Sequence, residues 1–238
     1  MLGGSVYIAF IRFAISLAGV ILLFSEMSES RFDRKKTIIC YGGFSAVLLS
    51  LACIWYVADW ENCVRSVAFI MYVCFMVFAI FMSSDSIYLS IYKLALTFYL
   101  LAVFLIGGLE VSIIFFDRNV WADIIVRVLL ILLMTILIEK KLKNSIRDFS
   151  DYVEKEVDKF SVAIMIISIL FGIGFILNPN LKVATGYRLY QIITNFVLTG
   201  TLQLLMFRFY LHIGKEKEYV RENQLIQMNH RLLERQME

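Results

Sequence analysis

Proline and histidine are nearly absent from this 238-residue sequence, which holds one proline and two histidines. So little proline favours long helices over the alternating strands of a membrane barrel. Neither His212 nor His230 belongs to an H-E-x-x-H zinc motif or is placed beside a cysteine that it could activate. A serine nucleophile elbow and a lysine-containing phosphate loop are also missing. We therefore expect no catalytic residue, no metal site and no cofactor in this chain.

Charged residues are also scarce. They make up 18% of the chain, hydrophobic residues make up 60%, and the mean hydropathy is +0.77. Soluble domains are about half apolar and about one quarter charged. A chain this apolar cannot bury its surface in one compact core, so lipid must solvate it. We predict an all-α fold, a polytopic transmembrane helix bundle.

Apolar segments long enough to cross a membrane, about 17–25 residues, number seven. They are 5–24, 37–57, 66–82, 91–109, 121–138, 160–177 and 189–213. The first has no basic leader and no cleavage site after it, so we expect a retained span. Residues 111–116 either extend the fourth helix or form an interfacial stretch. This division predicts a transmembrane bundle over 1–213 and a cytoplasmic helix over 214–238.

Basic residues gather in alternate loops. The loop after the first segment holds Arg31, Arg34, Lys35 and Lys36, and the loop after the fifth holds Lys140, Lys141 and Lys143. Because lysine and arginine accumulate on the cytoplasmic side, these loops are predicted to lie inside. The amino terminus is then outside and the carboxyl terminus inside, as seven spans require.

Two charged segments are predicted to be helices outside the membrane. Residues 139–159 carry an amphipathic pattern of Ile146, Phe149, Tyr152, Val153 and Val157, typical of a short helix along the inner face.

Residues 214–238 lack proline and are rich in Glu, Gln, Arg and Leu, which favours a helix. Tyr219, Ile226 and Leu233 recur every seven residues, with Asn223 and His230 as polar positions that could set the register. This pattern predicts a coiled-coil-like seam between two copies of the chain. It covers fewer than the three or four heptads that identify a coiled coil, so a simple amphipathic helix is the alternative.

Polar side chains inside the apolar segments are the candidate binding residues. Asp123 and Arg127 are four residues apart and can pair on one helix face. Together with Glu110, Gln191 and Asn195 they could line an outward-facing pocket, or the amides could instead bond neighbouring helices. Arg12 either extends to the outer surface or takes a buried role. The glycine pairs 3–4, 42–43 and 107–108, and the pair 172 and 174, indicate close helix packing.

The order of these features resembles a known family. The resemblance is carried by the basic loop Ser30-Arg31-Phe32-Asp33-Arg34-Lys35-Lys36, the turn Ser83-Ser84-Asp85-Ser86, the exit Ile138-Glu139-Lys140-Lys141-Leu142-Lys143, and the linker Glu222-Asn223-Gln224-Leu225-Ile226-Gln227-Met228-Asn229. This looks like the membrane sensor region of the peptide-pheromone histidine kinases of Gram-positive bacteria, the accessory-gene-regulator-like, GHKL-type group. In that family a phosphoacceptor histidine followed by an acidic residue, and an ATP-binding domain, would come next. His230 is followed by Arg231, so the phosphoacceptor role is not assigned to it.

The resemblance implies a multi-pass protein of a bacterial plasma membrane, dimeric and surrounded by lipid. It would bind an extracellular peptide or small-molecule signal and act on a response regulator through a kinase domain that this sequence lacks. The chain would be a truncated kinase or a sensor-only relative, and no nucleic-acid partner is expected. A small membrane transporter or export subunit, and a non-catalytic membrane assembly protein, are the alternatives.

Overall fold

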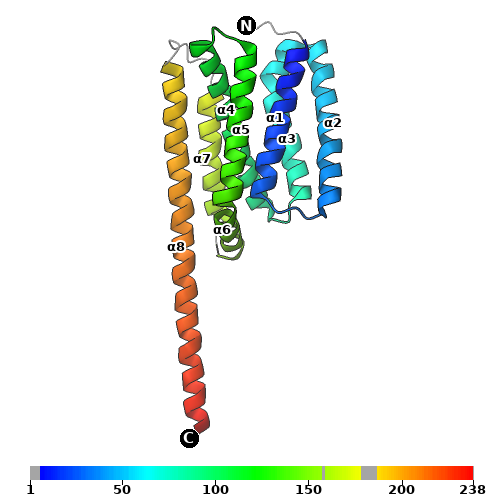
Figure 1. The fold of residues 1–238 in the computed structure, drawn as a ribbon. Coiled ribbons are helices and arrows are strands. Elements are labelled where there is room, and N and C mark those ends of the chain that lie inside the picture. Colours follow the sequence, from blue (N-terminus) through cyan, green and yellow to red (C-terminus); the bar gives the residue numbers. More distant parts are fainter. Residues whose placement is uncertain (1–5, 157–158, 178–186, 238) are drawn as a thin grey trace.

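A computed structural model describes residues 6–156, 159–177 and 187–237, and this part of the chain is helical throughout apart from short turns. The apolar helices are α1 (Val6–Met27), α2 (Arg34–Ala58), α3 (Trp60–Met82), α4 (Ile87–Phe115), α5 (Val120–Leu137), α7 (Lys159–Leu177) and α8 (Tyr187–Met237). They run side by side as a bundle (Figure 1). We call the end where α1 begins the upper end, and the end from which α8 projects the lower end.

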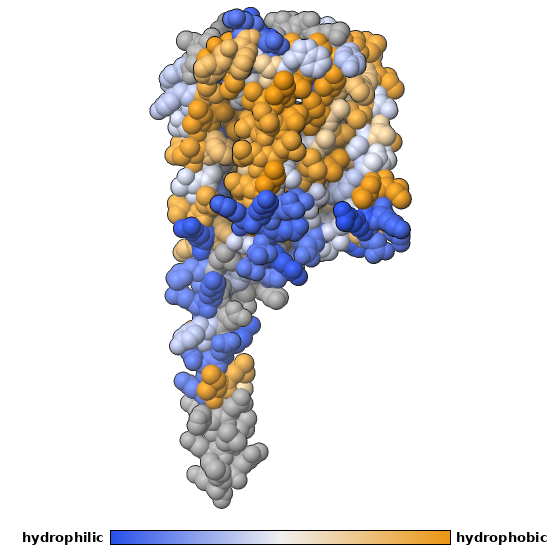
Figure 2. Space-filling model, viewed as in Figure 1, coloured by the Kyte–Doolittle hydropathy of each residue, from blue (hydrophilic) through white to orange (hydrophobic). Residues whose placement is uncertain are grey.

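Within the described residues, five helices are long and apolar enough to cross a membrane: α1, α2, α4, α5 and α8. In α3 and α7 the described apolar stretches, Ile70–Met82 and Ser161–Ile176, are shorter. Large apolar side chains cover the outside of the bundle, and Figure 2 shows them as a broad hydrophobic band above a hydrophilic lower end. A water-soluble monomer rarely exposes a patch of this size. The chain is therefore a multi-pass membrane protein.

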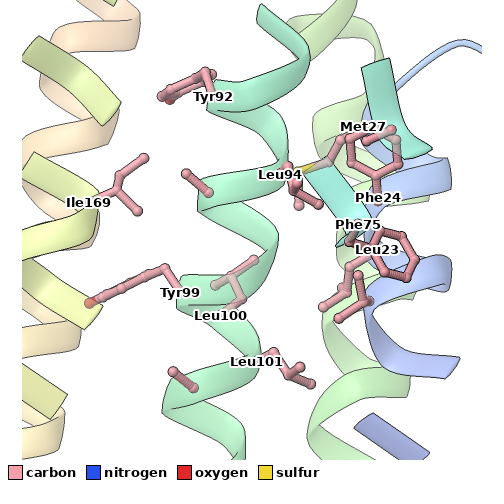
Figure 3. Packing of buried hydrophobic residues seen from close by; sticks show 14 of the residues in the cluster. Leu23, Phe24, Met27, Phe75, Tyr92, Leu94, Tyr99, Leu100, Leu101 and Ile169 are labelled. Carbon is pink, nitrogen blue, oxygen red and sulfur yellow. The ribbon is translucent and has the colours of Figure 1, made fainter. Parts of the chain in front are cut away.

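Helix α4 lies at the centre of the bundle. Half of its most apolar stretch is buried, whereas the corresponding share is 17–28% in the other four long helices. It packs against α1, α3, α5, α7 and α8. Figure 3 shows Leu23, Phe24 and Met27 of α1 on one side of α4 and Ile169 of α7 on the other. Residues 111–115 continue α4, which settles the alternatives left by the sequence in favour of a longer helix.

The turns at the lower end are tied to each other by polar contacts. Ser84 N donates to Glu29 O at 2.9 Å and Arg31 N donates to Met82 O at 2.8 Å. Asp85 accepts hydrogen bonds from two serine hydroxyls and pairs with Lys93 Nζ at 2.8 Å. Lys93 is buried, and its partner explains how a lysine can sit inside an apolar helix without an unpaired charge.

The charged segment after α5 is helical as far as Glu156, as predicted, and Val157 of the predicted apolar pattern lies outside the described residues. A π-helical turn, η1 (Ile138–Leu142), follows α5 directly and leads into α6 (Lys143–Glu156). Phe149 and Val153 of α6 are buried. Phe149 packs on Phe207 of α8 with ring centroids 4.7 Å apart and on Tyr92 of α4 at 5.9 Å. The apolar face of α6 is therefore covered by protein.

The glycine prediction is partly wrong. A Cβ added to Gly108 would lie 2.9 Å from Arg127 Cγ, and one added to Gly172 would lie 2.9 Å from Tyr99 Cε2, so both glycines mark close approaches. No atom comes within 4 Å of a Cβ built at four other glycines, and packing in this bundle does not require them: Gly42, Gly43, Gly107 and Gly174. Gly3 and Gly4 lie outside the described residues.

Candidate functional site

The predicted binding residues, and Arg12 with them, lie near the upper end of the bundle. Arg12 is six residues after the start of α1, Arg127 is seven after the start of α5, and Glu110 is five before the end of α4. With a rise of about 1.5 Å per residue, each is within roughly 11 Å of its helix end. They form a layer of charge inside otherwise apolar helices, and we call it the upper charged layer.

Asp123 is the centre of this layer. Its side chain is fully buried, and its two oxygens are held by different arginines: Arg127 Nε lies 2.5 Å from Oδ1, and Arg12 Nη2 lies 2.8 Å from Oδ2. The local pair within α5 is as predicted. Of the two roles considered for Arg12, the structure shows a part-buried one, in which its guanidinium joins α1 to α5 across the bundle.

Gly108 of α4 provides the space for this cluster. A Cβ at that position would lie 3.3 Å from Asp123 Oδ1 as well as 2.9 Å from Arg127 Cγ. The charged groups of α5 therefore rest directly against the backbone of the central helix. Any movement of this ion cluster would press on α4, because a packed interior transmits small displacements.

Glu110 is placed in a second ion pair. Its carboxylate is buried and lies 3.3 Å from Nε of Arg188, in the first turn of α8. Gln191 is one turn further along α8, and its Oε1 is a buried acceptor without a hydrogen-bond partner among the described residues. The sequence could not assign Arg188 to Glu110, since nothing in a hydropathy profile states which helices are neighbours.

Asn195 bonds a neighbouring helix. Tyr99 Oη of α4 donates to Asn195 Oδ1 at 3.0 Å, and it lies 3.1 Å from the backbone oxygen of the same residue. The five predicted residues thus fall into two groups around α4. Asp123 and Arg127 pair toward α1, whereas Glu110 pairs with α8, the helix that carries Gln191 and Asn195.

Helix α8 is attached to the bundle below this layer as well. Gln203 Nε2 donates to Ser168 Oγ of α7 at 2.7 Å, and its Oε1 accepts from Tyr92 Oη of α4 at 3.2 Å. Phe207 then meets α6 through Phe149. Buried side-chain hydrogen bonds in a membrane are worth about 0.6 kcal/mol on average, so their value here is in fixing which face of α8 meets the bundle.

Beyond the bundle α8 continues as one helix to Met237 (Figure 1). Tyr219 is 67% exposed and Ile226 is 59% exposed, and other apolar residues of the projecting part, Val220, Leu225 and Met228, are exposed as well. Asn223 is partly covered by its helix neighbours. The side chains of His230 and Leu233, also predicted for the seam, lie outside the part of the chain that is described. A projecting rod with exposed apolar residues is what a helix that pairs with a partner requires.

Comparisons with protein-family models, with curated proteins and with solved structures find no match to this chain. Its class, a multi-pass membrane protein, therefore rests on the apolar helices alone.

Proposed function

We propose that this chain is the membrane input region of a two-component histidine kinase. It crosses a bacterial plasma membrane seven times with the amino terminus outside, binds an extracellular signal of peptide type, and passes a conformational change to a dimeric cytoplasmic helix. The observation that carries this proposal is the unbroken course of α8 from Tyr187, beside the upper charged layer, to Met237. The catalytic step and the response regulator would belong to a kinase domain acting downstream.

The charge distribution supports this orientation. Arg34, Lys35 and Lys36 are exposed at the lower end at the start of α2, and Lys140 and Lys141 are exposed there in the turn between α5 and α6. An excess of lysine and arginine marks the cytoplasmic side. The lower end would thus face the cytoplasm, which places α8's projection inside the cell and the upper charged layer near the outer surface.

Dimensions support α8 as the route for the signal. Its 51 residues extend about 75 Å at 1.5 Å per residue, whereas the hydrocarbon core is about 30 Å thick. One rigid element therefore reaches from the outer leaflet to well inside the cell. A signal molecule could shift this helix only to the extent that it binds two arrangements of the bundle with different affinity.

A cross-linking experiment tests the proposal. In a variant without native cysteines, Ile226→Cys reports on the contact between two copies of α8 in membrane vesicles. The peptide fraction of spent medium from the source bacterium should change the cross-linked fraction about twofold or more, because a twofold population shift needs only a small difference in binding energy. The same fraction after protease digestion is the control.

A proline between the bundle and the Ile226→Cys reporter tests whether α8 must be a continuous helix. Val220→Pro should abolish the response at Ile226→Cys, because proline removes a helical hydrogen bond and clashes with the preceding turn. Val220→Ala, which keeps the helix, should preserve the response. Proline at Leu225 is expected to uncouple signal from output in the same way. A response that survives Val220→Pro, or no response to the peptide fraction in the parent, would contradict the proposal.

A further inference from the structure

We infer that the contact between two copies of this chain does not stop where α8 leaves the bundle but continues up its membrane-embedded part, as one parallel seam that begins near Leu198. This inference concerns the partner surface and rests on the proposed function only for the pairing of the projecting helix.

The register of the seam follows from the seven-residue spacing of Tyr219 and Ile226 on the projecting part. Counting back in sevens from Ile226 and Tyr219 reaches His212, Leu205 and Leu198, and counting back from Asn223 reaches Glu216, Phe209 and Leu202. The two series alternate at spacings of three and four, the spacing of a coiled-coil seam. The membrane-embedded members are all exposed in the single chain: Leu198 66%, Leu202 45%, Leu205 61% and Phe209 61%.

The contacts of α8 with its own chain use a different face. Thr199, Gln203 and Phe207 face α7, α4 and α6. The upper limit of the seam is set in the same way, because the next position, Asn195, is turned toward Tyr99 of α4. The seam is therefore the set of heptad positions that the bundle leaves uncovered.

A second copy fits this surface better than lipid alone. Lipid can cover Leu205, but it cannot cover Tyr219 and Ile226, which are exposed on the part of α8 that projects beyond the bundle. A coiled coil needs about three or four heptads. Extension to Leu198 gives a seam of four heptads, since 28 residues separate Leu198 from Ile226.

His212 and Glu216 lie in the seam where α8 leaves the bundle. They are one helical turn apart, with His212 Nε2 3.6 Å from Glu216 Oε1, and both side chains are more than two thirds exposed. Polar residues at seam positions fix register and oligomeric state at some cost in stability. This pair would hold two parallel copies in register between the apolar parts of the seam.

Adjacent leucines provide the test. Leu204 and Leu205 are both leucine and almost equally exposed, 58% and 61%, but successive residues of a helix point about 100° apart. In the cysteine-free full chain in native membranes, Leu205→Cys should form disulfide-linked dimers about fivefold faster than Leu204→Cys under mild oxidation, because only Leu205 lies at a seam position. Leu198→Cys should exceed Val197→Cys in the same way, and dilution with added lipid should leave these ratios unchanged.

The outcomes separate this inference from the proposed function. Equal or reversed rates at Leu204 and Leu205, or ratios lost on lipid dilution, would overturn the membrane seam. If Ile226→Cys still cross-linked and responded to the peptide fraction, the proposed function would stand without it. A Leu205 preference in a chain that does not respond to peptide would support the seam and refute the sensor. No cross-linking at either Leu205 or Ile226 would refute both.

Discussion

Removing the carboxylate of Asp123 should destabilise the bundle more than removing either arginine that it binds. Asp123→Asn leaves Arg12 and Arg127 facing each other without a counter-charge, in a place where Asp123 is fully buried. Breaking a buried pair by removing one partner costs about 3–5 kcal/mol. For a chain of this size that corresponds to a fall in melting temperature of roughly 6–20 °C.

Each arginine substitution leaves a balanced pair behind. Arg12→Gln leaves Asp123 bound to Arg127, and Arg127→Gln leaves it bound to Arg12. We expect losses of about 1 kcal/mol or less for Arg12→Gln, whose side chain is 22% exposed. Adding Arg12→Gln to Asp123→Asn should then restore part of the lost stability, because it removes one of two repelling charges. Such a rescue is a signature of coupled residues.

Cys63 provides the readout. It is fully buried and has no disulfide partner, so a thiol-reactive fluorophore will label it only as the bundle unfolds. With the other three cysteines replaced by alanine, a thermal ramp in lipid nanodiscs gives the melting temperature of each variant. If the Arg12→Gln/Asp123→Asn double variant were less stable than Asp123→Asn alone, the explanation by unbalanced charge would be wrong.

Three further predictions can be tested with the same thermal ramp. Gly172→Ala should lower the free energy of unfolding by about 1–3 kcal/mol, because the added Cβ would crowd Tyr99. The matched control Gly174→Ala should be neutral or stabilising by up to about 1 kcal/mol. Equal effects of the two substitutions would refute the packing argument. Phe149→Ala should cost about 3–5 kcal/mol, since the ring is buried between α4 and α8, and wild-type stability would show that α6 is not docked. Arg118→Gly should stabilise the turn before α5 by up to about 1 kcal/mol, because Arg118 has φ of 62°, and a loss of stability would contradict this.

The location of the helices was predictable because hydropathy is a local property. Apart from residue 5, which lies outside the described residues, each of the seven predicted apolar segments lies in a helix, and the charged segment after α5 is also helical, although its apolar face packs on protein. The ends were less predictable. Helix α4 begins at Ile87 rather than near residue 91 and extends to Phe115. Serine and tyrosine residues near its start and the isolated Lys93 lower the hydropathy of this segment in the sequence. In the folded chain Asp85 neutralises the charge of the lysine.

The candidate site was predictable only where partners share a helix. The pairing of Asp123 with Arg127 follows from their spacing of four. The partners of Arg12 and Glu110 are 111 and 78 residues away in sequence, and only the packing of α1 on α5 and of α4 on α8 brings them together. A charged residue in an apolar helix indicates that a partner exists. Which residue is the partner depends on the tertiary arrangement.

The direct succession of α5, η1 and α6 has a mechanical consequence. Because no loop interrupts this succession, a tilt of α5 would be carried into α6 instead of being absorbed. The 14 residues of α6 form an arm about 20 Å long, so a tilt of about 5° would move its far end by nearly 2 Å. That end carries Glu154, whose Oε1 accepts a hydrogen bond from Ser86 N at the start of α4. A disturbance of the ion cluster on α5 would therefore reach the lower end of α4 through this hydrogen bond, independently of any movement of α8.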